Sequence, residues 1–166
     1  MPNLSTAPSD DVLDQIKAIL GHGGWKAGAE AISYFDDPRG RFCGEAFLVV
    51  LPESTQQVSE LVSLCNREKI ALIPYGGGTG VVAGQLSIET ENMLILSLER
   101  MNSISEVSED DCTVTVQAGC ILAHLHAAAN EKELQFPLSM ASKGSCSVGG
   151  NLATNAGGIQ VVRYGN

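Results

Sequence analysis

The sequence predicts a domain that combines helices with a sheet containing parallel strands. Two short apolar runs, 47–51 and 71–75, flank a segment with helical periodicity. Together they form a β-α-β unit of about thirty residues, which implies a parallel strand pair with a right-handed crossover. The chain has 166 residues, of which 44% are hydrophobic and 17% charged, a balance typical of a folded protein. We therefore expect one domain, or one domain with part of another.

A first helix is predicted to begin after Ser9, which can cap it. Asp10 and Asp11 favour the positive N-terminal end of a helix, and Gly21 ends the pattern. The apolar side chains that share one face of this helix are Val12, Ile16, Ile19 and Leu20. Residues 21–45 contain many glycines and few apolar pairs, so we expect mostly loop there.

The β-α-β unit has clear boundaries. The run 47–51 is continuously apolar and is followed by Pro52, which suits a short buried strand. Ser54 and Gln57 have the spacing of a capping box, and apolar residues then recur at helical spacing to about Lys69. The second apolar run follows directly as a strand.

The sequence pattern of the second half of the chain predicts two more strands and a helix. Residues 93–98 form an apolar strand, and residues 113–117 alternate Val with Thr and Gln, as in a half-buried strand. Residues 121–134 have helical spacing, with Leu122, Leu125 and Ala129 facing inward. Small residues dominate afterwards, and residues 159–162 look like a strand.

The charge balance excludes several classes of function. The chain has 10 Lys and Arg against 19 Asp and Glu, a formal net charge of −9. Nucleic-acid binding depends on neutralising phosphates with Lys and Arg, so we expect no nucleic-acid partner. Binding to anionic membrane surfaces is disfavoured for the same reason. No apolar run approaches the ~20 residues of a membrane span.

The cysteines and the N-terminus indicate a cytoplasmic protein. The five cysteines include no CxxC pair, which favours reduced thiols over a disulfide framework or a zinc site. The first residues have neither a basic start nor an apolar core, so no signal peptide is expected. His124 and His126 lie two apart on a helix and face different sides. We therefore predict no metal site, and no nucleophile elbow or catalytic Ser-His or Cys-His spacing is present.

A first glycine cluster, Gly76–Gly80, directly follows the strand 71–75. Such a run lets successive backbone N–H groups point into one concavity, an anion nest suited to phosphate or diphosphate. A tight turn between strands is the alternative, but it needs fewer glycines. A Walker loop is excluded because no Gly-Lys pair occurs. A Rossmann fingerprint is excluded because residues 83–90 show no helical periodicity.

A second glycine cluster spans residues 144–158 and offers few large apolar side chains. Its Ser, Thr and Asn residues and its expected free N–H groups suit a long polar ligand lying against exposed backbone. A flexible linker is the alternative. Cys146, within this cluster, is interpreted as a small buried thiol.

These motifs resemble, in order, the FAD-binding domain of the vanillyl-alcohol oxidase flavoprotein superfamily, the PCMH type. The segments that carry the resemblance are LPEST at 51–55, PYGGGTG at 74–80, LSLERMN at 96–102, QAG at 117–119, KGSCSVGGNLATNAGG at 143–158 and VRYG at 162–165. The last two are similar to a branch with FAD-linked D-lactate dehydrogenases, the glycolate oxidase flavoprotein subunit and D-2-hydroxyglutarate dehydrogenase. The resemblance covers about residues 40–166.

The resemblance implies an α+β, two-subdomain fold that clamps FAD, with the second subdomain incomplete here. It implies a helix-and-loop extension at 1–40 and an FAD-binding domain at 41–166. The family continues past Gly165 into a substrate domain, so we expect this chain to be the N-terminal part of a longer enzyme. The first glycine loop would hold the diphosphate, and residues 137–158 would run along FAD toward the flavin.

The cofactor-binding residues expected from the clusters and the resemblance are Pro74, Tyr75, Gly76, Gly77, Gly78, Thr79, Gly80, Gly84, Gln85, Pro137, Leu138, Ser139, Ser142, Gly149, Gly150, Asn151, Thr154, Asn155 and Gly157. Two residues depart from the family pattern. Ala83 stands where the family commonly has Gly, and Ser139 stands where close relatives often have Asp.

The expected activity is oxidation of a D-2-hydroxy acid, such as lactate, glycolate or 2-hydroxyglutarate, by hydride transfer to flavin N5. The substrate would bind through the missing domain, so no catalytic residue is assigned. The sequence does not identify the electron acceptor. A homodimer is the candidate assembly. Two alternatives stay open: another enzyme on the same domain, of the alditol or sugar oxidase or enolpyruvyl reductase type, and a non-catalytic nucleotide-binding module.

Overall fold

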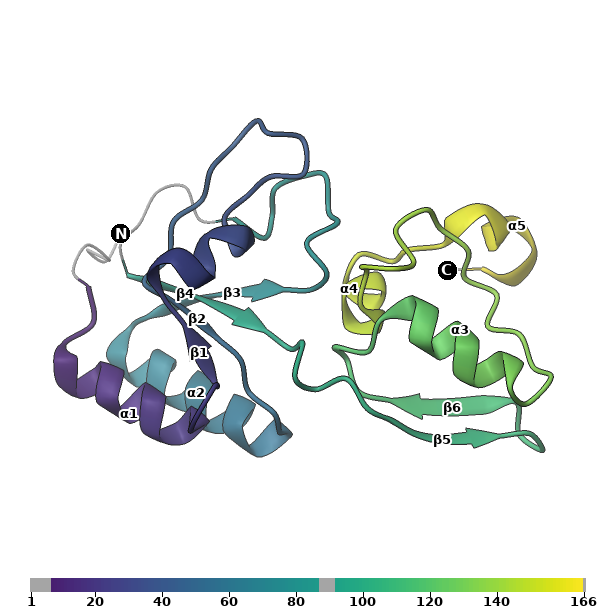
Figure 1. The fold of residues 1–166 in the computed structure, drawn as a ribbon, viewed down its shortest axis with the longest axis horizontal. Helices are drawn as coiled ribbons and strands as arrows, with labels where there is room; N and C mark the ends of the chain where they lie inside the picture. The colour runs from purple at the N-terminus through teal and green to yellow at the C-terminus, as the bar shows by residue number, and fades with distance from the viewer. Residues whose placement is uncertain (1–6, 87–91, 166) are drawn as a thin grey trace. The chain divides into compact units, whose positions relative to one another are not determined.

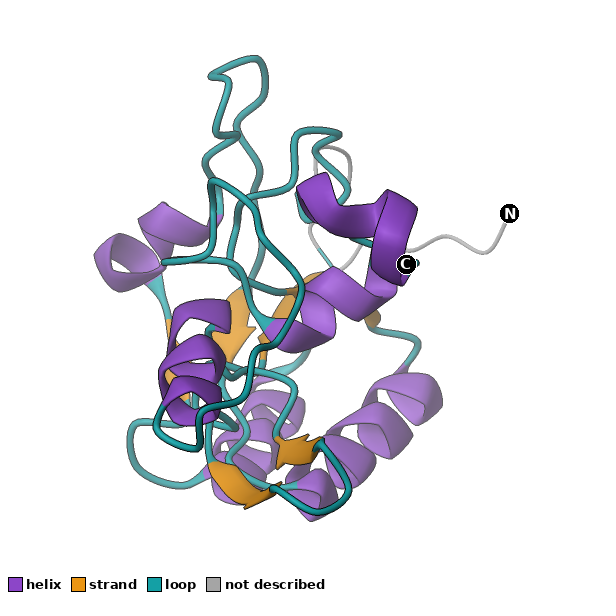
Figure 2. Ribbon diagram, turned by 90° about the vertical axis from the view of Figure 1, so that its right-hand side faces the viewer, coloured by secondary structure: helices purple, strands orange, loops and turns teal. Residues whose placement is uncertain are grey.

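The structure is a computed structural model that describes residues 7–86 and 92–165 (Figure 1). The chain divides into two compact units, Met1–Arg100 and Met101–Asn166. Each unit has its own sheet, and loops make up much of the chain between the helices and strands (teal in Figure 2). Among the described residues, no helix is long and apolar enough to cross a membrane.

The first unit is built on a four-stranded sheet with the order β1-β2-β4-β3. The strands are β1 (Trp25–Lys26), β2 (Leu48–Val50), β3 (Ala71–Tyr75) and β4 (Met93–Ser97). β2 and β3 each pair with β4 in parallel, and β1 is antiparallel to β2. The predicted β-α-β unit is therefore correct in direction but wrong in adjacency. The strongly apolar β4, with Leu94 and Ile95 fully buried, occupies the centre between the two predicted partners.

Helices cover one face of this sheet. α1 (Asp10–Leu20) and α2 (Thr55–Glu68) lie side by side against it, as Figure 1 shows. The side chains that form this core layer include Ile16, Leu20, Leu48, Val50, Leu61, Leu64 and Leu94. On the other face, Val49, Leu51 and Ile95 pack against Ala31 and Tyr34. Burial on both faces explains why β2 is continuously apolar.

The helix starts follow the capping residues predicted from sequence. Ser9 Oγ accepts from the Val12 N–H, and Ser54 Oγ accepts from the Gln57 N–H at 3.2 Å. The return bond of the predicted capping box differs. The Gln57 side chain accepts from the Glu53 N–H at 2.8 Å instead of from the N–H of the cap.

The segment 21–45, expected to be mostly loop, contains short regular elements. Besides β1 it forms η1, a 3₁₀ helix over Gly28–Tyr34, and an antiparallel bridge between Asp36 and Cys43. Ala31 and Tyr34 are the buried residues of η1. Two buried side chains three residues apart fit the three-residue turn of a 3₁₀ helix. This pair is too short a signal to stand out in a glycine-rich sequence.

The second unit has a two-stranded antiparallel sheet and α3. The strands are β5 (Ile104–Ser108), which the sequence did not predict, and β6 (Thr113–Val116). α3 (Leu122–Asn130) buries Leu122, Leu125 and Ala129, as expected. It ends four residues before the predicted boundary at 134. The chain turns there, because Glu133 has a φ of 56° and the Leu134 N–H donates to the Ala129 carbonyl at 3.0 Å.

In the glycine-rich segment 144–158, for which no helix was predicted, α4 covers Val148–Ala153. One prediction for this part of the chain is wrong. The strand expected at 159–162 is instead η2 (Gly158–Gln160) followed by α5 (Val161–Tyr164). Ile159 and Val162 are 83% and 98% exposed, so no sheet covers the apolar residues that suggested a strand.

Candidate functional site

The first glycine cluster is the loop that leaves the carboxyl end of β3. This edge of a parallel sheet is where α/β folds commonly bind ligands. Gly78 has a φ of 67°, and a Cβ at this position would collide with the Tyr75 hydroxyl. The positive φ and this close approach to the Tyr75 side chain therefore favour glycine at this position.

The N–H groups of this loop are available to a ligand. Within residues 7–86 and 92–165, no N–H group of Gly76–Gly80 donates a hydrogen bond. The loop is fixed instead through a carbonyl, since Gln85 Nε2 donates to Gly80 O at 3.3 Å. Unused backbone donors in a glycine-rich loop are what an anion nest requires.

Tyr75 lies next to the loop and packs against Tyr34, which belongs to a polar network. Its ring centroid is 5.1 Å from that of Tyr34. The Tyr34 hydroxyl donates to Glu99 at 2.6 Å, and Lys26 Nζ donates to Tyr34 at 2.5 Å and to Glu99 at 3.0 Å. Burial raises the pKa of Tyr75, and the charge of Glu99 adds to this shift. The Tyr75 hydroxyl therefore keeps its proton at neutral pH and can donate it in a hydrogen bond.

Glu99 is the anion at the centre of this network. Burial alone would raise its pKa, but hydrogen bonds from Tyr34 and Lys26 outweigh burial and hold the pKa below its usual value. Ser97 donates to the same carboxylate at 3.3 Å. The network that holds Tyr34 against Tyr75 is therefore an ionised cluster over the ordinary pH range.

The second glycine cluster is organised differently, because the N–H groups at the start of α4 are already used. In α4, the Gly149 N–H donates to Ala118 O at 2.7 Å. The N–H groups of Gly150 and Asn151 donate to the Ser147 side chain at 3.2 Å and the Ser147 carbonyl at 2.9 Å. The prediction of free backbone donors is therefore wrong for these three residues. Ser147, which caps α4, accepts the N–H groups of Gly150 and Asn151, and Ala118 accepts that of Gly149.

Close packing explains two of the glycines in this segment. A Cβ on Gly149 would lie 2.8 Å from Ala118 Cβ and 2.9 Å from Ala118 O. A Cβ on Gly158, whose φ is 61°, would collide with Ser139 O. The same Ser139 carbonyl accepts from the Ile159 N–H at 3.2 Å. These contacts bring distant parts of the second unit together.

Asn151 offers a polar group that the described residues leave unused. The residue is 8% exposed, and its Nδ2 is buried with no hydrogen-bond partner among the described residues. A buried amide without a partner is costly, so a ligand that accepts from it would stabilise this state. Thr154 is different, since its hydroxyl already donates to Gly150 O at 2.9 Å.

Comparison with known proteins identifies the family. Residues 46–166 match the family described as FAD binding domain. The chain belongs to this family. FAD is its cofactor, as the resemblance predicted, and both the free donors of the glycine loop and the orphaned Asn151 amide suit a polar dinucleotide.

Relatives of the FAD-binding domain carry dehydrogenase names. The chain is 43% identical over 138 residues to the D-2-hydroxyglutarate dehydrogenase of Xanthomonas citri pv. viticola, covering 83% of this chain and 29% of the relative. It is 35% identical over 166 residues to "D-2-hydroxyglutarate dehydrogenase, mitochondrial" of Arabidopsis thaliana, covering 99% of this chain and 29% of the relative. The chain thus spans about 29% of the length of these relatives.

A solved structure confirms the predicted fold. The FAD-binding domain superposes on an alkyldihydroxyacetonephosphate synthase with a TM-score of 0.85 and 23% sequence identity, covering 98% of this chain and 32% of that chain. This agreement supports the α+β fold of the PCMH type.

The predicted cofactor residues fall into both units. Those of the first unit lie together at the carboxyl end of β3: Pro74, Tyr75, Gly76, Gly77, Gly78, Thr79, Gly80, Gly84 and Gln85. Those of the second unit lie in the segment before α4, in α4 and just after it: Pro137, Leu138, Ser139, Ser142, Gly149, Gly150, Asn151, Thr154, Asn155 and Gly157. Their contacts with FAD stay predictions.

Sequence reasoning missed the supporting residues Lys26, Tyr34 and Glu99. They come from β1, η1 and the residues after β4, so up to 73 positions separate residues that hydrogen-bond. No local spacing signals such a cluster. For a metal site, no group of three His, Cys, Asp or Glu side chains converges within the described ranges.

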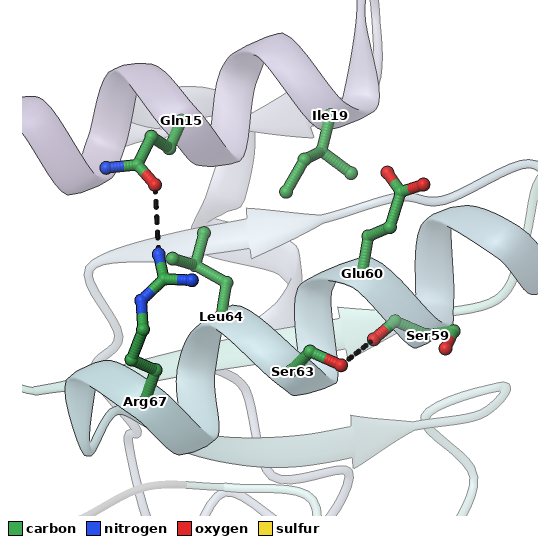
Figure 3. Close-up of a pocket in the computed structure, with 7 residues that line it drawn as sticks. All are labelled: Gln15, Ile19, Ser59, Glu60, Ser63, Leu64 and Arg67. Atoms are coloured by element: carbon green, nitrogen blue, oxygen red, sulfur yellow. Dashed lines mark hydrogen bonds between the residues drawn. The ribbon is translucent and has the colours of Figure 1, made fainter.

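A shallow groove between α1 and α2 is a less suitable site. Figure 3 shows Arg67 reaching across it to Gln15, at 3.0 Å, and Ser63 bonded to the Ser59 carbonyl at 2.8 Å. Several polar groups along the groove are therefore already hydrogen-bonded within the protein, including Glu60, which accepts from Gln56 at 2.6 Å. The groove lies in the helical layer of the first unit, not at the carboxyl ends of the strands.

Proposed function

We propose that this chain is the cofactor-binding part of an FAD-dependent dehydrogenase that oxidises a D-2-hydroxy acid. The observation that carries the proposal is the glycine loop after β3, whose N–H groups are unused within the described residues, in a chain of the FAD-binding family. The names of the relatives favour D-2-hydroxyglutarate as the substrate. D-Lactate and glycolate are the other acids of this class.

The glycine loop would bind the diphosphate of FAD. Gly76–Gly80 would donate backbone hydrogen bonds to phosphate oxygens, which are strong because the acceptor is charged. The Tyr75 hydroxyl, beneath Gly78, would add a donor. Asn151, from the second unit, would donate its buried amide to an oxygen or nitrogen of the cofactor.

The chemistry itself belongs to the cofactor. Bound FAD would accept a hydride from Cα of the hydroxy acid while the hydroxyl proton passes to a base. The part of this chain is to bind FAD and to hold it in one orientation. The loop would do this with its glycine backbone and with Tyr75, which packs against the Tyr34 that Glu99 holds.

Charge at the loop tests this proposal directly. Gly77→Asp would place a carboxylate beside the diphosphate, whereas Gly77→Asn has almost the same shape without the charge. We expect the Asp variant to purify without flavin and the Asn variant to retain a substantial share. The measurement is flavin absorbance per mole of folded protein. If the Gly77→Asp variant retained stoichiometric flavin, the loop would not be the diphosphate site.

The substrate is tested in the full-length protein. Reduction of an artificial electron acceptor would be followed with D-2-hydroxyglutarate, D-lactate and glycolate in parallel. We expect the highest kcat/KM with D-2-hydroxyglutarate. A preference for D-lactate or glycolate would change the substrate within the class, and reduction with none of them would refute the class. The predicted cytoplasmic location is tested separately, by cell fractionation.

A further inference from the structure

The segment before β2 forms a small hairpin built around Asp37. The hairpin is closed by the bridge between Asp36 and Cys43, and Gly40, with a φ of 63°, turns the chain. The Asp37 side chain is 0% exposed and accepts three bonds from Arg41. These run from the Arg41 N–H at 3.1 Å, from Nε at 2.9 Å and from Nη2 at 3.3 Å.

Arg41 connects this hairpin to the glycine loop. Its Nη2 donates to the carbonyl of Val81 at 2.6 Å, and Val81 directly follows Gly80. Asp37 holds the guanidinium in a bidentate contact, so its position is set before any ligand arrives. This pairing lowers the pKa of Asp37 to about 2, because Arg41 donates hydrogen bonds to the carboxylate. The pair therefore persists through the neutral range.

The guanidinium of Arg41 also brings a positive charge to a loop whose own segment of the chain has none. Residues 70–99 contain no Lys or Arg. Arg100 follows, but its guanidinium contacts Leu51 O and Glu53. Arg41 thus brings a positive charge to the end of the loop from 40 positions away. Its side chain is 42% exposed, and its Nη1 donates to no group in the described part of the chain.

We propose that Arg41 is a binding residue of the diphosphate site, held by Asp37 so that it braces the glycine loop at Val81 and sets a positive charge beside the FAD diphosphate. This inference rests on the proposed diphosphate role of the loop. A phosphate anion gains from a fixed guanidinium beyond what backbone dipoles supply, especially in a chain with a net charge of −9. Asp37 offsets part of the charge but keeps the guanidinium on the loop side.

Two substitutions separate the charge from the brace. Arg41→Gln removes both, whereas Arg41→Lys keeps the charge and loses the bidentate contact. Arg39→Gln is the matched control, because Arg39 is an exposed cation of the same hairpin. Apo-protein would be titrated with FAD at low and high ionic strength, about 0.05 and 0.5 M, since salt screens an exposed charge.

We expect Arg41→Gln to raise the Kd for FAD about tenfold at low salt, in line with the loss of a charge-assisted contact, and less at high salt. Arg41→Lys should lose about threefold and keep the salt dependence of the wild type. Arg39→Gln should stay within about twofold. Melting temperatures show whether each variant folds. If Arg41→Gln does not fold, the affinity and salt dependence of Arg41→Lys are used as the test.

The proposal is overturned if Arg41→Gln binds FAD as the wild type does at both salt concentrations. It is also overturned if the Gln and Lys variants lose the same affinity and the salt dependence does not change, because the charge would then have no role. Gly77→Asp separates this failure from a failure of the site. If Gly77→Asp loses FAD and Arg41→Gln does not, the loop binds the diphosphate without Arg41. If neither variant loses FAD, the loop itself is not the site.

Discussion

Replacing Gly149 with Ala tests whether this glycine serves packing within the second unit. A Cβ at this position would lie 2.8 Å from Ala118 Cβ and 2.9 Å from Ala118 O. Neither atom is the end of a flexible side chain, so α4 or the residues after β6 must move. The hydrogen bond from the Gly149 N–H to Ala118 O, at 2.7 Å, already holds the two segments at this distance.

The expected loss of stability follows from two opposing effects. Overpacking of a close contact costs about 1–3 kcal/mol, and both obstructing atoms are fixed, which favours the upper half of that range. Alanine gains about 1 kcal/mol over glycine inside a helix. The net loss is therefore about 1–2 kcal/mol, which lowers the melting temperature by about 2–8 °C for a chain of this size.

The assay is thermal unfolding followed by circular dichroism, with denaturant unfolding as a second measure. Gly144→Ala is the matched control, since its Cβ would meet nothing within 4 Å. That variant should change the melting temperature by at most about 2 °C. Adding Ala118→Gly to Gly149→Ala should recover part of the loss, because one of the two colliding atoms is removed. An unchanged or higher melting temperature for Gly149→Ala would refute the packing argument.

Two further predictions concern Asn155 and the cysteines. Asn155 has a φ of 52° and is exposed, so Asn155→Leu should cost about 1 kcal/mol in strain while Asn155→Gly keeps the melting temperature. Both should weaken FAD binding if the amide contacts the cofactor, and wild-type affinity in Asn155→Gly would make Asn155 a structural residue. Burial raises the pKa of Cys65 to about 11, so a thiol reagent at about pH 8 should modify the exposed Cys43 and Cys112 quickly and Cys65 only on unfolding. Rapid modification of Cys65 in the native protein would contradict its burial.

The sequence determined most of the local elements because their signals lie within a few residues of one another. Ser9 and Ser54 cap the helices they were expected to cap, and the strands 71–75 and 93–98 appear at β3 and β4. The glycine loop followed from its position after a strand. Capping, periodicity and glycine content are local properties, which a sequence displays directly.

The second glycine cluster shows where local reasoning stops. Its composition suggested exposed backbone, yet Ser147 caps a helix there, and Gly149 is required by contact with Ala118, which is 31 positions earlier. A glycine that frees a backbone for a ligand and a glycine that admits a neighbouring segment look the same in sequence. Ile159 and Val162 likewise suggested a strand, although they lie in η2 and α5 and pair with no strand of the described residues.

Tertiary structure alone decided how the glycine loop is supported. β4 lies between β2 and β3, although it follows both in the chain. Tyr34 reaches Glu99 across 65 positions, and Arg41 reaches Val81 across 40. These contacts depend on which segments the fold brings together. They join residues far apart in the chain, so no local sequence pattern indicates them. The sequence therefore identified the glycine loop and the Tyr75 that precedes it, and the fold supplied Tyr34, which packs against Tyr75, and Arg41, which donates to Val81 just after the loop.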